Sequence, residues 1–317
     1  MELLYIIFYL LIGLLLLVGG AEGLIRGSSS IALSFGISPL VVGLTLVAFG
    51  TSSPELVISI KAAMEGNSDI SLGNVIGSNI ANIGLILGLA VVVQPIMVKL
   101  QVVKKEIPIM IVISFIFFIM LLTVNEINLV HGFIFVLLLI LYTSFGIYLS
   151  RKEEKSEAAE EINVGKKLNT WIAVLLAVGG LSFLAFGADL FLTGAVELAK
   201  KLGLSDIVIG LTIVAVGTSL PELFTSVYAA FKKEADIALG NIVGSNIFNI
   251  FGIIGITSII NPLQVSSIKF IDITIMLVFS ILVLIVSKTG LKIQRTEGII
   301  LLLIYSGYVY YLIAISN

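Results

Sequence analysis

The chain has 317 residues, of which 58% are hydrophobic and 12% are charged, and its formal net charge at pH 7 is −2. Soluble proteins carry about 25% charged residues, so this composition excludes a soluble globular protein and indicates a polytopic membrane protein. The near-neutral charge argues against nucleic acid as a partner. The sequence has no cysteine, which excludes disulfides and thiolate metal sites.

Hydropathy predicts ten membrane-spanning helices, since about 20 apolar residues are needed to cross the hydrocarbon core. The first apolar run is long and lacks the basic residues of a secretory signal, so we interpret it as a retained span. The expected fold is therefore an all-α polytopic membrane protein. The ten spans are predicted at residues 3–25, 38–64, 70–95, 107–124, 129–149, 170–194, 206–231, 236–260, 270–287 and 297–315.

Lysine and arginine are unevenly distributed over the connectors between these spans. Alternate connectors hold about 14 basic residues in one set and 4 in the other. Because basic connectors stay in the cytoplasm, both termini are predicted to lie outside the cell. The longest connector, residues 151–168, is charged and is interpreted as a short cytoplasmic hinge. It separates a first five-helix unit, residues 1–150, from a second, residues 169–317.

An internal repeat relates the two halves of the chain. A constant offset of 167 residues maps residues 12–95 onto the second half, and roughly 26 of the 43 positions from Val41 to Ile83 are identical to their partners at 208–250. Each half holds an odd number of predicted spans, so the second copy enters the membrane from the opposite side. We therefore predict two inverted-topology repeats with broken core helices, whose equivalent motifs meet at the membrane midplane.

The motif Gly-Thr-Ser-x-Pro-Glu occurs in both halves, at residues 50–55 and 217–222, each time inside a predicted span. A charged group at that depth costs at least ~2.5 kcal/mol, so Glu55 and Glu222 are candidate functional residues. Proline lacks an N–H and disfavours helical backbone in the residue before it, so the helix is expected to break there and to free the carbonyls of residues 48–51. Further oxygens come from Ala48, Thr51 and Ser52, and in the second copy from Ala215, Thr218 and Ser219.

A single glutamate beside a proline is compatible with a helix kink that carries a paired or protonated carboxyl group. Packing alone does not require the same polar residues twice, so the duplication favours a functional site. Glu22 is different, because it lies near the end of a span and can pair with Arg26 one turn later. His131 is the only histidine and is interpreted as an interfacial residue near a connector.

A second motif, Gly-Asn-x-x-Gly-Ser-Asn-Ile-x-Asn, spans residues 73–82 and 240–249. Its residues Asn74, Ser78 and Asn82 are four apart, so on a helix they form a polar stripe along one face. Its two glycines, also four apart, allow another helix to pack closely. The acidic residues that precede the two copies are expected to be helix N-caps rather than ligands. These residues are Asp69 and Asp236.

Together the motifs offer two carboxylates surrounded by hydroxyl, amide and carbonyl oxygens. An all-oxygen set suits a hard cation, and Ca²⁺, with ~6–8 flexible ligands, fits it better than Mg²⁺ with its strict octahedron. Zn²⁺ and Cu⁺ prefer nitrogen or sulfur ligands, and neither motif contains histidine, cysteine or methionine. Two negative charges can be balanced by one Ca²⁺ or by monovalent ions, which would allow exchange at a shared site.

The paired motifs resemble the two α-repeats of the cation/Ca²⁺ exchanger superfamily, and within it the prokaryotic sodium/calcium exchanger branch. The resemblance covers nearly the whole chain. It implies a ten-helix fold in which the second, third, seventh and eighth spans form the core and the tilted first and sixth spans slide across it. It implies Ca²⁺ and Na⁺ as bound, transported ions and membrane lipid as surroundings, without a cofactor; the sequence does not specify an oligomer.

Carried over position by position, the resemblance implies that Glu55 and Glu222 are the principal Ca²⁺ ligands. Backbone oxygens of Thr51 and Thr218 would complete the shell of this ion. Two mirror-related sodium sites would also form. One is implied at Ala48, Thr51, Ser78 and Glu55, the other at Ala215, Thr218, Ser245 and Glu222, with Ser52 and Ser219 adjacent and Asn82 and Asn249 facing the centre.

The chain departs from the family in two places. Well-studied sodium/calcium exchangers carry an aspartate at the position of Asn249, so this chain has one carboxylate fewer. The hinge at 151–168 is too short for the Ca²⁺-binding regulatory domains of animal relatives. Proton-coupled relatives place a glutamate shortly after the first asparagine of the second motif, where this chain has residues 75–78 without one, which favours Na⁺ as counter-ion.

The sequence therefore predicts a secondary antiporter that exchanges Ca²⁺ for Na⁺ across the cell membrane by alternating access at a midplane site. Alternatives are an antiporter of the same fold that is coupled to H⁺ or depends on K⁺, and a passive cation channel. An intramembrane hydrolase would need a catalytic dyad, and neither a Ser–His pair nor an Asp pair is visible in the predicted spans. We therefore expect the protein not to be an enzyme.

Overall fold

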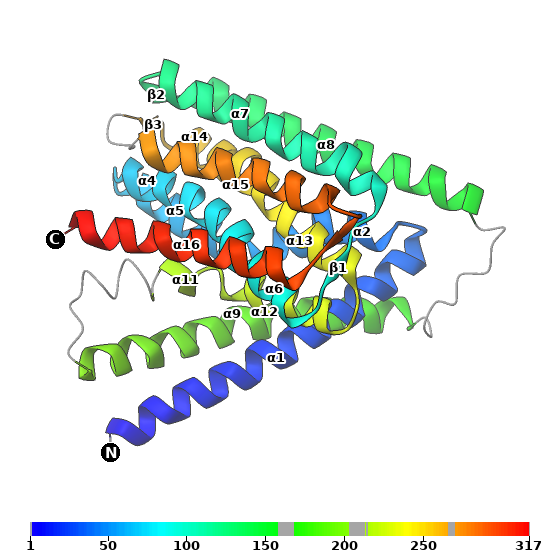
Figure 1. Cartoon of the computed structure of the whole chain (residues 1–317), viewed down its shortest axis with the longest axis horizontal. Helices are drawn as coiled ribbons and strands as arrows, with labels where there is room; N and C mark the ends of the chain where they lie inside the picture. Colours follow the sequence, from blue (N-terminus) through cyan, green and yellow to red (C-terminus); the bar gives the residue numbers. More distant parts are fainter. Residues whose placement is uncertain (1, 158–167, 203–212, 214, 266–269, 317) are drawn as a thin grey trace.

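A computed structural model describes residues 2–157, 168–202, 213, 215–265 and 270–316 (Figure 1). The described chain is mostly helical, and its π-helical segments are labelled η. The first half contains α1 Glu2–Phe35, α2 Pro39–Val42, η1 Gly43–Val47, α3 Ala48–Thr51, α4 Ser53–Met64, α5 Ser68–Ala81, η2 Asn82–Leu87, α6 Gly88–Val93, β1 Ile96–Met97, η3 Val102–Glu106, α7 Ile107–Thr123, β2 Glu126–Ile127 and α8 Leu129–Glu157. The second half contains α9 Thr170–Lys201, α11 Ala215–Gly217, α12 Leu220–Phe231, α13 Ala235–Phe248, η5 Asn249–Ile254, α14 Gly255–Ile260, β3 Leu263–Gln264, α15 Phe270–Lys288, β4 Lys292–Ile293 and α16 Arg295–Ser316.

Eight helices in the described ranges are long and apolar enough to cross a membrane, and one bent helix pair raises the number to nine. These nine correspond to nine of the ten predicted spans. The remaining one was predicted at 206–231; its first residues lie outside the described part, and α12 forms its end. Residues 151–157 of the predicted hinge are helical and form the last two turns of α8, whereas 158–167 lie outside the described residues.

The first and sixth spans are longer than predicted, because α1 continues to Phe35 and α9 to Lys201. The two helices lie side by side, antiparallel, at one edge of the molecule, and α8 lies at the opposite edge (Figure 1). Their backbones touch at glycines: a Cβ added to Gly180 would lie 2.4 Å from the backbone nitrogen of Leu24, and one added to Gly27 would lie 2.6 Å from the carbonyl oxygen of Ala173. Small residues at such contacts allow close approach in lipid, and this packing supports the additional helical turns.

The centre of the molecule is formed by two continuous helical spans, Ser68–Val93 and Ala235–Ile260. Their most apolar windows are 78% and 89% buried inside the protein, whereas those of α8 and α16 are only 11% buried. An apolar helix that is mostly exposed is stable only in lipid, so α8 and α16 are outer helices. The repeated asparagine motif lies on the two central spans, and its polar residues therefore depend on one another rather than on solvent.

Two short antiparallel sheets connect the halves of the chain. Strand β1 pairs with β4 through Ile96 and Ile293, and β2 pairs with β3 through Ile127 and Leu263. The offset of 167 residues maps β1 onto β3 and β2 onto β4, and it reproduces the residue pairing to within one position. The contacts between the halves therefore follow the same pseudo-symmetry as the sequence repeat.

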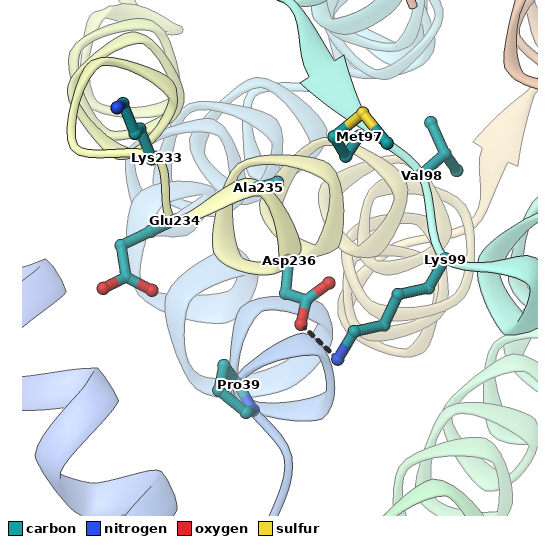
Figure 2. Close-up of a pocket in the computed structure, with 8 residues that line it drawn as sticks. All are labelled: Pro39, Met97, Val98, Lys99, Lys233, Glu234, Ala235 and Asp236. Carbon is teal, nitrogen blue, oxygen red and sulfur yellow. Dashed lines mark ion pairs between the residues drawn. The ribbon is translucent and has the colours of Figure 1, made fainter. Parts of the chain in front are cut away.

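The N-cap prediction for the two aspartates is wrong. Asn67 and Glu234 occupy the N-cap positions of α5 and α13, and the aspartates lie two residues later, within the first turn, where the positive end of the helix dipole favours a carboxylate. Asp236 is paired with Lys99 at 2.7 Å. The pair lines a cavity of about 400 Å³. Figure 2 shows that Glu234, which also lines this cavity, points away from the Asp236–Lys99 pair. Partial burial, and then the charge of Asp236, raise the pKa of Glu234.

Candidate cation site

The helix break predicted at the first motif is present. Helix α3 ends at Thr51, Ser52 adopts a non-helical turn with φ −82° and ψ 8°, and α4 begins with Pro54 in its first turn. The two segments are bent by 46°. The proline lacks the donor that would continue the helix, while its fixed φ suits the first turn of the next one. Glu55 follows in that first turn, next to the positive end of the helix dipole.

The second motif copy has the same geometry. Ser219 has φ −88° and ψ 12° and separates α11 from α12, which places Pro221 and Glu222 in the first turn of α12. Both glutamates are buried, with 1% and 2% of their surfaces exposed. A buried carboxylate is costly unless hydrogen bonds or a cation compensate its charge. The groups around the two glutamates therefore define the site.

The two motif copies meet, as the inverted repeat predicts. The hydroxyl of Ser52 donates a 2.7 Å hydrogen bond to Oε1 of Glu222, and the hydroxyl of Ser219 donates a 3.0 Å hydrogen bond to Oε1 of Glu55. Each glutamate is therefore held by the serine of the other copy. The hydroxyl groups of Thr51 and Thr218 lie close to Glu222 and Glu55, respectively.

Asn74 and Asn241 have a different role from the one suggested by the polar stripe. The amide of Asn74 donates to the hydroxyl of Ser59 at 2.9 Å, and that of Asn241 donates to the hydroxyl of Ser226 at 2.9 Å. These bonds join α5 to α4 and α13 to α12. The stripe is split because its first asparagine faces the neighbouring broken helix, where Thr51 also donates to Oδ1 of Asn241 at 3.0 Å. The first asparagine of each motif braces the break.

Asn82 and Asn249 each begin a π-helical segment, η2 and η5. Such segments widen the helix by one residue and occur frequently at functional sites. The amide of Asn82 donates to Oδ1 of Asn246 at 2.9 Å, and that of Asn249 donates to Oδ1 of Asn79 at 2.9 Å. Sequence reasoning did not assign a role to Asn79 or Asn246, although each lies three residues, close to one helical turn, before the asparagine that was assigned.

Four oxygens stand out within the part of the chain that the structure describes. Oε2 of Glu55 and of Glu222, and Oδ1 of Asn82 and of Asn249, are buried and have no hydrogen-bond partner. An unsatisfied buried acceptor costs about 1–3 kcal/mol, and more if it is charged. Unpartnered oxygens of this kind are suited to binding a cation. The donor set fits a hard cation such as Ca²⁺ or Na⁺.

The remaining predicted site residues lie on α3, α5, α11 and α13. Ser78 and Ser245 are buried, and among the described residues Oγ of Ser245 has no partner. The carbonyl of Ala48 is not free as predicted, because it accepts the backbone N–H of Ser52 at 3.0 Å. The reason is that the helix loses its regular bonding one residue later than expected. Ala215 is the first residue of α11.

Residues that were predicted to lie outside the site do so. Glu22 and Arg26 form an ion pair at 2.5 Å, one turn apart on α1. Nδ1 of His131 accepts the backbone N–H of Asn128, just before α8, so the histidine stabilises a helix start. Within the described residues there is no group of three or more His, Cys, Asp or Glu side chains that could hold a metal ion. A cation site in this region therefore depends on two carboxylates and neutral oxygens.

Apolar spans that enclose two buried glutamates at symmetric helix breaks define a multi-pass membrane transport protein. Residues 5–148 and 172–314 match the model of the sodium/calcium exchanger protein family, and the chain belongs to this family. The family consists of transporters rather than enzymes.

Similar proteins cover nearly the whole chain. CaxA of Alkalimonas amylolytica is 38% identical over 312 residues, which are 96% of this chain and 97% of that protein. The sodium/calcium exchanger MaX1 of Methanosarcina acetivorans is 35% identical over 341 aligned positions, covering 94% and 96% of the two chains. A solved structure of the sodium-calcium exchanger NCX_Mj superposes with a TM-score of 0.83 at 32% identity, over 98% of this chain and 99% of that one.

Proposed function

We propose that the protein exchanges Ca²⁺ for Na⁺ across the cell membrane, by alternating access at a site between Glu55 and Glu222. The observation that carries the proposal is the set of four buried acceptor oxygens without a partner in the described chain, two from glutamates and two from asparagines. They come in pairs related by the 167-residue offset. A site built equally from both halves can be approached equivalently from both membrane faces, which alternating access requires.

The proposed architecture is that of ten spans in two inverted repeats, residues 1–150 and 169–317, joined by a cytoplasmic connector at 151–168. Both termini would lie outside the cell. The pairing of β1 with β4 and of β2 with β3, and the crossed serine–glutamate bonds, support a pseudo-two-fold axis. The proposed ligands are oxygens of Glu55, Glu222, Asn82 and Asn249, with Thr51, Thr218, Ser52, Ser219, Ser78, Ser245, Ala48 and Ala215 around them.

Ca²⁺ flux in reconstituted vesicles tests the coupling ion. We expect Ca²⁺ uptake into Na⁺-loaded vesicles to stop when the Na⁺ gradient is removed, and to be unaffected by a pH gradient or by removal of K⁺. Uptake that follows the pH gradient or requires K⁺ would assign the fold to one of the alternative couplings. Uptake that needs no counter-gradient would indicate a passive channel.

Charge balance predicts how many Na⁺ ions exchange. Two carboxylates neutralise one Ca²⁺ or two Na⁺, so replacement of one by the other moves no net charge. We expect Na⁺-driven Ca²⁺ uptake to be independent of membrane potential in the wild type. Asn249→Asp adds a third carboxylate, which a third Na⁺ would balance, so uptake should become dependent on potential.

The measurement is Ca²⁺ uptake with the potential set by valinomycin and K⁺, after K⁺ independence has been established. Asn82→Asp is the matched variant, because Asn82 is the repeat equivalent of Asn249 and has the same unpartnered Oδ1 within the described residues. Ca²⁺ uptake by Asn82→Asp should become dependent on membrane potential in the same way as uptake by Asn249→Asp. Potential-dependent uptake in the wild type, or no gain in either variant, would contradict this charge balance.

A further inference from the structure

Two methionines outside both motifs are connected to the cation site through buried asparagines. The amide nitrogen of Asn246 donates to Sδ of Met110 at 3.6 Å, and Oδ1 of Asn246 accepts from Asn82. In a second, equivalent set of contacts, the amide nitrogen of Asn79 donates to Sδ of Met276 at 3.8 Å, and Oδ1 of Asn79 accepts from Asn249. We call these two chains of hydrogen-bonded side chains the relays, Met110–Asn246–Asn82 and Met276–Asn79–Asn249. Every one of these six residues is at most 1% exposed.

The acceptors beside each amide decide its orientation: the sulfur of Met110 for Asn246, and for Asn79 the sulfur of Met276 together with the backbone carbonyl of Asn246 at 3.4 Å. A thioether sulfur accepts a hydrogen bond but has no hydrogen to donate, whereas an amide can turn by 180° and exchange its donor and acceptor ends. Beside Met110, Asn246 therefore presents its NH₂ group to the sulfur and its Oδ1 to Asn82. Asn82 must then use its own NH₂ group for that bond. Oδ1 of Asn82 is therefore the end of this amide that takes no part in the relay.

The remaining end is one of the four oxygens without a partner in the described chain. η2, which begins with Asn82, packs against α12, which carries Glu222; η5, which begins with Asn249, packs against α4, which carries Glu55. A reversed amide would turn an NH₂ donor toward this acidic region, where it could bond to a carboxylate and repel a cation. Charged hydrogen bonds contribute about 1.5–3 kcal/mol, so reversal would be favoured in the absence of the relay.

We propose that Met110 and Met276 are positioning residues that keep Oδ1 of Asn82 and of Asn249 turned toward the transported cation. The inference rests on the proposed function, because it assumes that these two oxygens bind the cation. The methionines lie on α7 and α15, which pack against each other and do not carry either motif. They act through the asparagines, without contact to the ion.

Met110→Leu and Met276→Leu test the proposal, because leucine fills a similar volume but cannot accept a hydrogen bond. We expect the dissociation constant for Ca²⁺, measured on purified protein by equilibrium ⁴⁵Ca²⁺ binding, to rise about three- to tenfold in each variant, since only part of the population would hold the competent amide orientation. Met120→Leu, on the same helix α7 and packed against the core, is the matched control and should bind like the wild type. Melting temperatures without Ca²⁺ should differ little among the three.

A double-mutant cycle separates positioning from packing. In the Asn82→Ala background, Met110→Leu should have no further effect on the dissociation constant, because the relay no longer has an end to orient. An undiminished effect there would show that the sulfur acts through general packing. Unchanged Ca²⁺ binding in both methionine variants, with a wild type that binds and exchanges Ca²⁺, would overturn the relay alone. A wild type that neither binds nor exchanges Ca²⁺ would overturn the proposed function, and the inference with it.

Discussion

Replacing Glu55 or Glu222 with glutamine is expected to abolish Na⁺-driven Ca²⁺ uptake and to leave a folded protein. Glutamine keeps the shape of the side chain and an oxygen that can accept the bond from Ser219 or Ser52, so the crossed contacts survive. The loss is one of the two buried negative charges of the proposed site. In a buried site a charge at ligand distance is worth several kcal/mol even at an effective dielectric constant of about 20. We therefore expect transport to fall at least ~100-fold.

The measurement is ⁴⁵Ca²⁺ uptake into Na⁺-loaded vesicles, with the melting temperature of the purified protein as the test of folding. Glu65→Gln is the matched control. Glu65 is exposed and directly follows α4, the helix that carries Glu55 in its first turn. It should transport like the wild type. Removal of a buried charge should leave the melting temperature without Ca²⁺ unchanged or raise it, because the remaining carboxylate has less repulsion to overcome. Exchange at the wild-type rate in either site variant would refute the assignment.

The positions of the two glutamates were predictable because each step rests on local chemistry. A proline one residue before the glutamate fixes the helix break, and the constant offset of 167 residues implies an inverted repeat that brings the copies together. The crossed bonds from Ser52 to Glu222 and from Ser219 to Glu55 follow from that symmetry. This part of the site needs only the sequence and the geometry of an odd number of spans.

The rest of the site depends on contacts between distant residues, which a local pattern does not encode. Asn79 and Asn246 have the helical spacing expected of residues that only pack against a neighbouring helix. Their role follows from the asparagines of the other half to which they are hydrogen-bonded, Asn249 and Asn82. The sulfur of Met110 accepts a hydrogen bond from the amide of Asn246, which lies 136 residues away in the sequence. The π-helical starts at Asn82 and Asn249 likewise have no sequence signal that distinguishes them from ordinary helix.

The length of α1 illustrates the same limit. Hydropathy ends the first span at residue 25, because Arg26 and the serines after it are polar. The helix continues for ten more residues because its small residues pack against α9, where backbone contacts replace side-chain hydrophobicity as the stabilising term. Such packing is visible only when both helices are in place.

Gly180→Leu is expected to prevent stable folding through this same contact. A Cβ on Gly180 would lie 2.4 Å from the backbone nitrogen of Leu24 and 2.7 Å from the carbonyl oxygen of Gly20. Both atoms belong to the backbone of α1, so relief requires the two helices to separate. Overpacking usually costs about 1–3 kcal/mol, and a clash with backbone should reach or exceed the upper end. The whole stability of a protein is only about 5–15 kcal/mol, so the melting temperature and the yield of monodisperse protein should both fall sharply.

Gly179→Leu provides the control at the neighbouring position. A Cβ on Gly179 has no atom of the described residues within 4 Å, so the same leucine should be accepted there. Both substitutions raise helix propensity by up to about 1 kcal/mol, and this gain cancels when the variants are compared. The difference between their melting temperatures then measures the α1–α9 contact alone. Equal stability of the two variants would mean that α1 can move away from α9 at little cost, and that glycine contacts do not hold this pair of helices together.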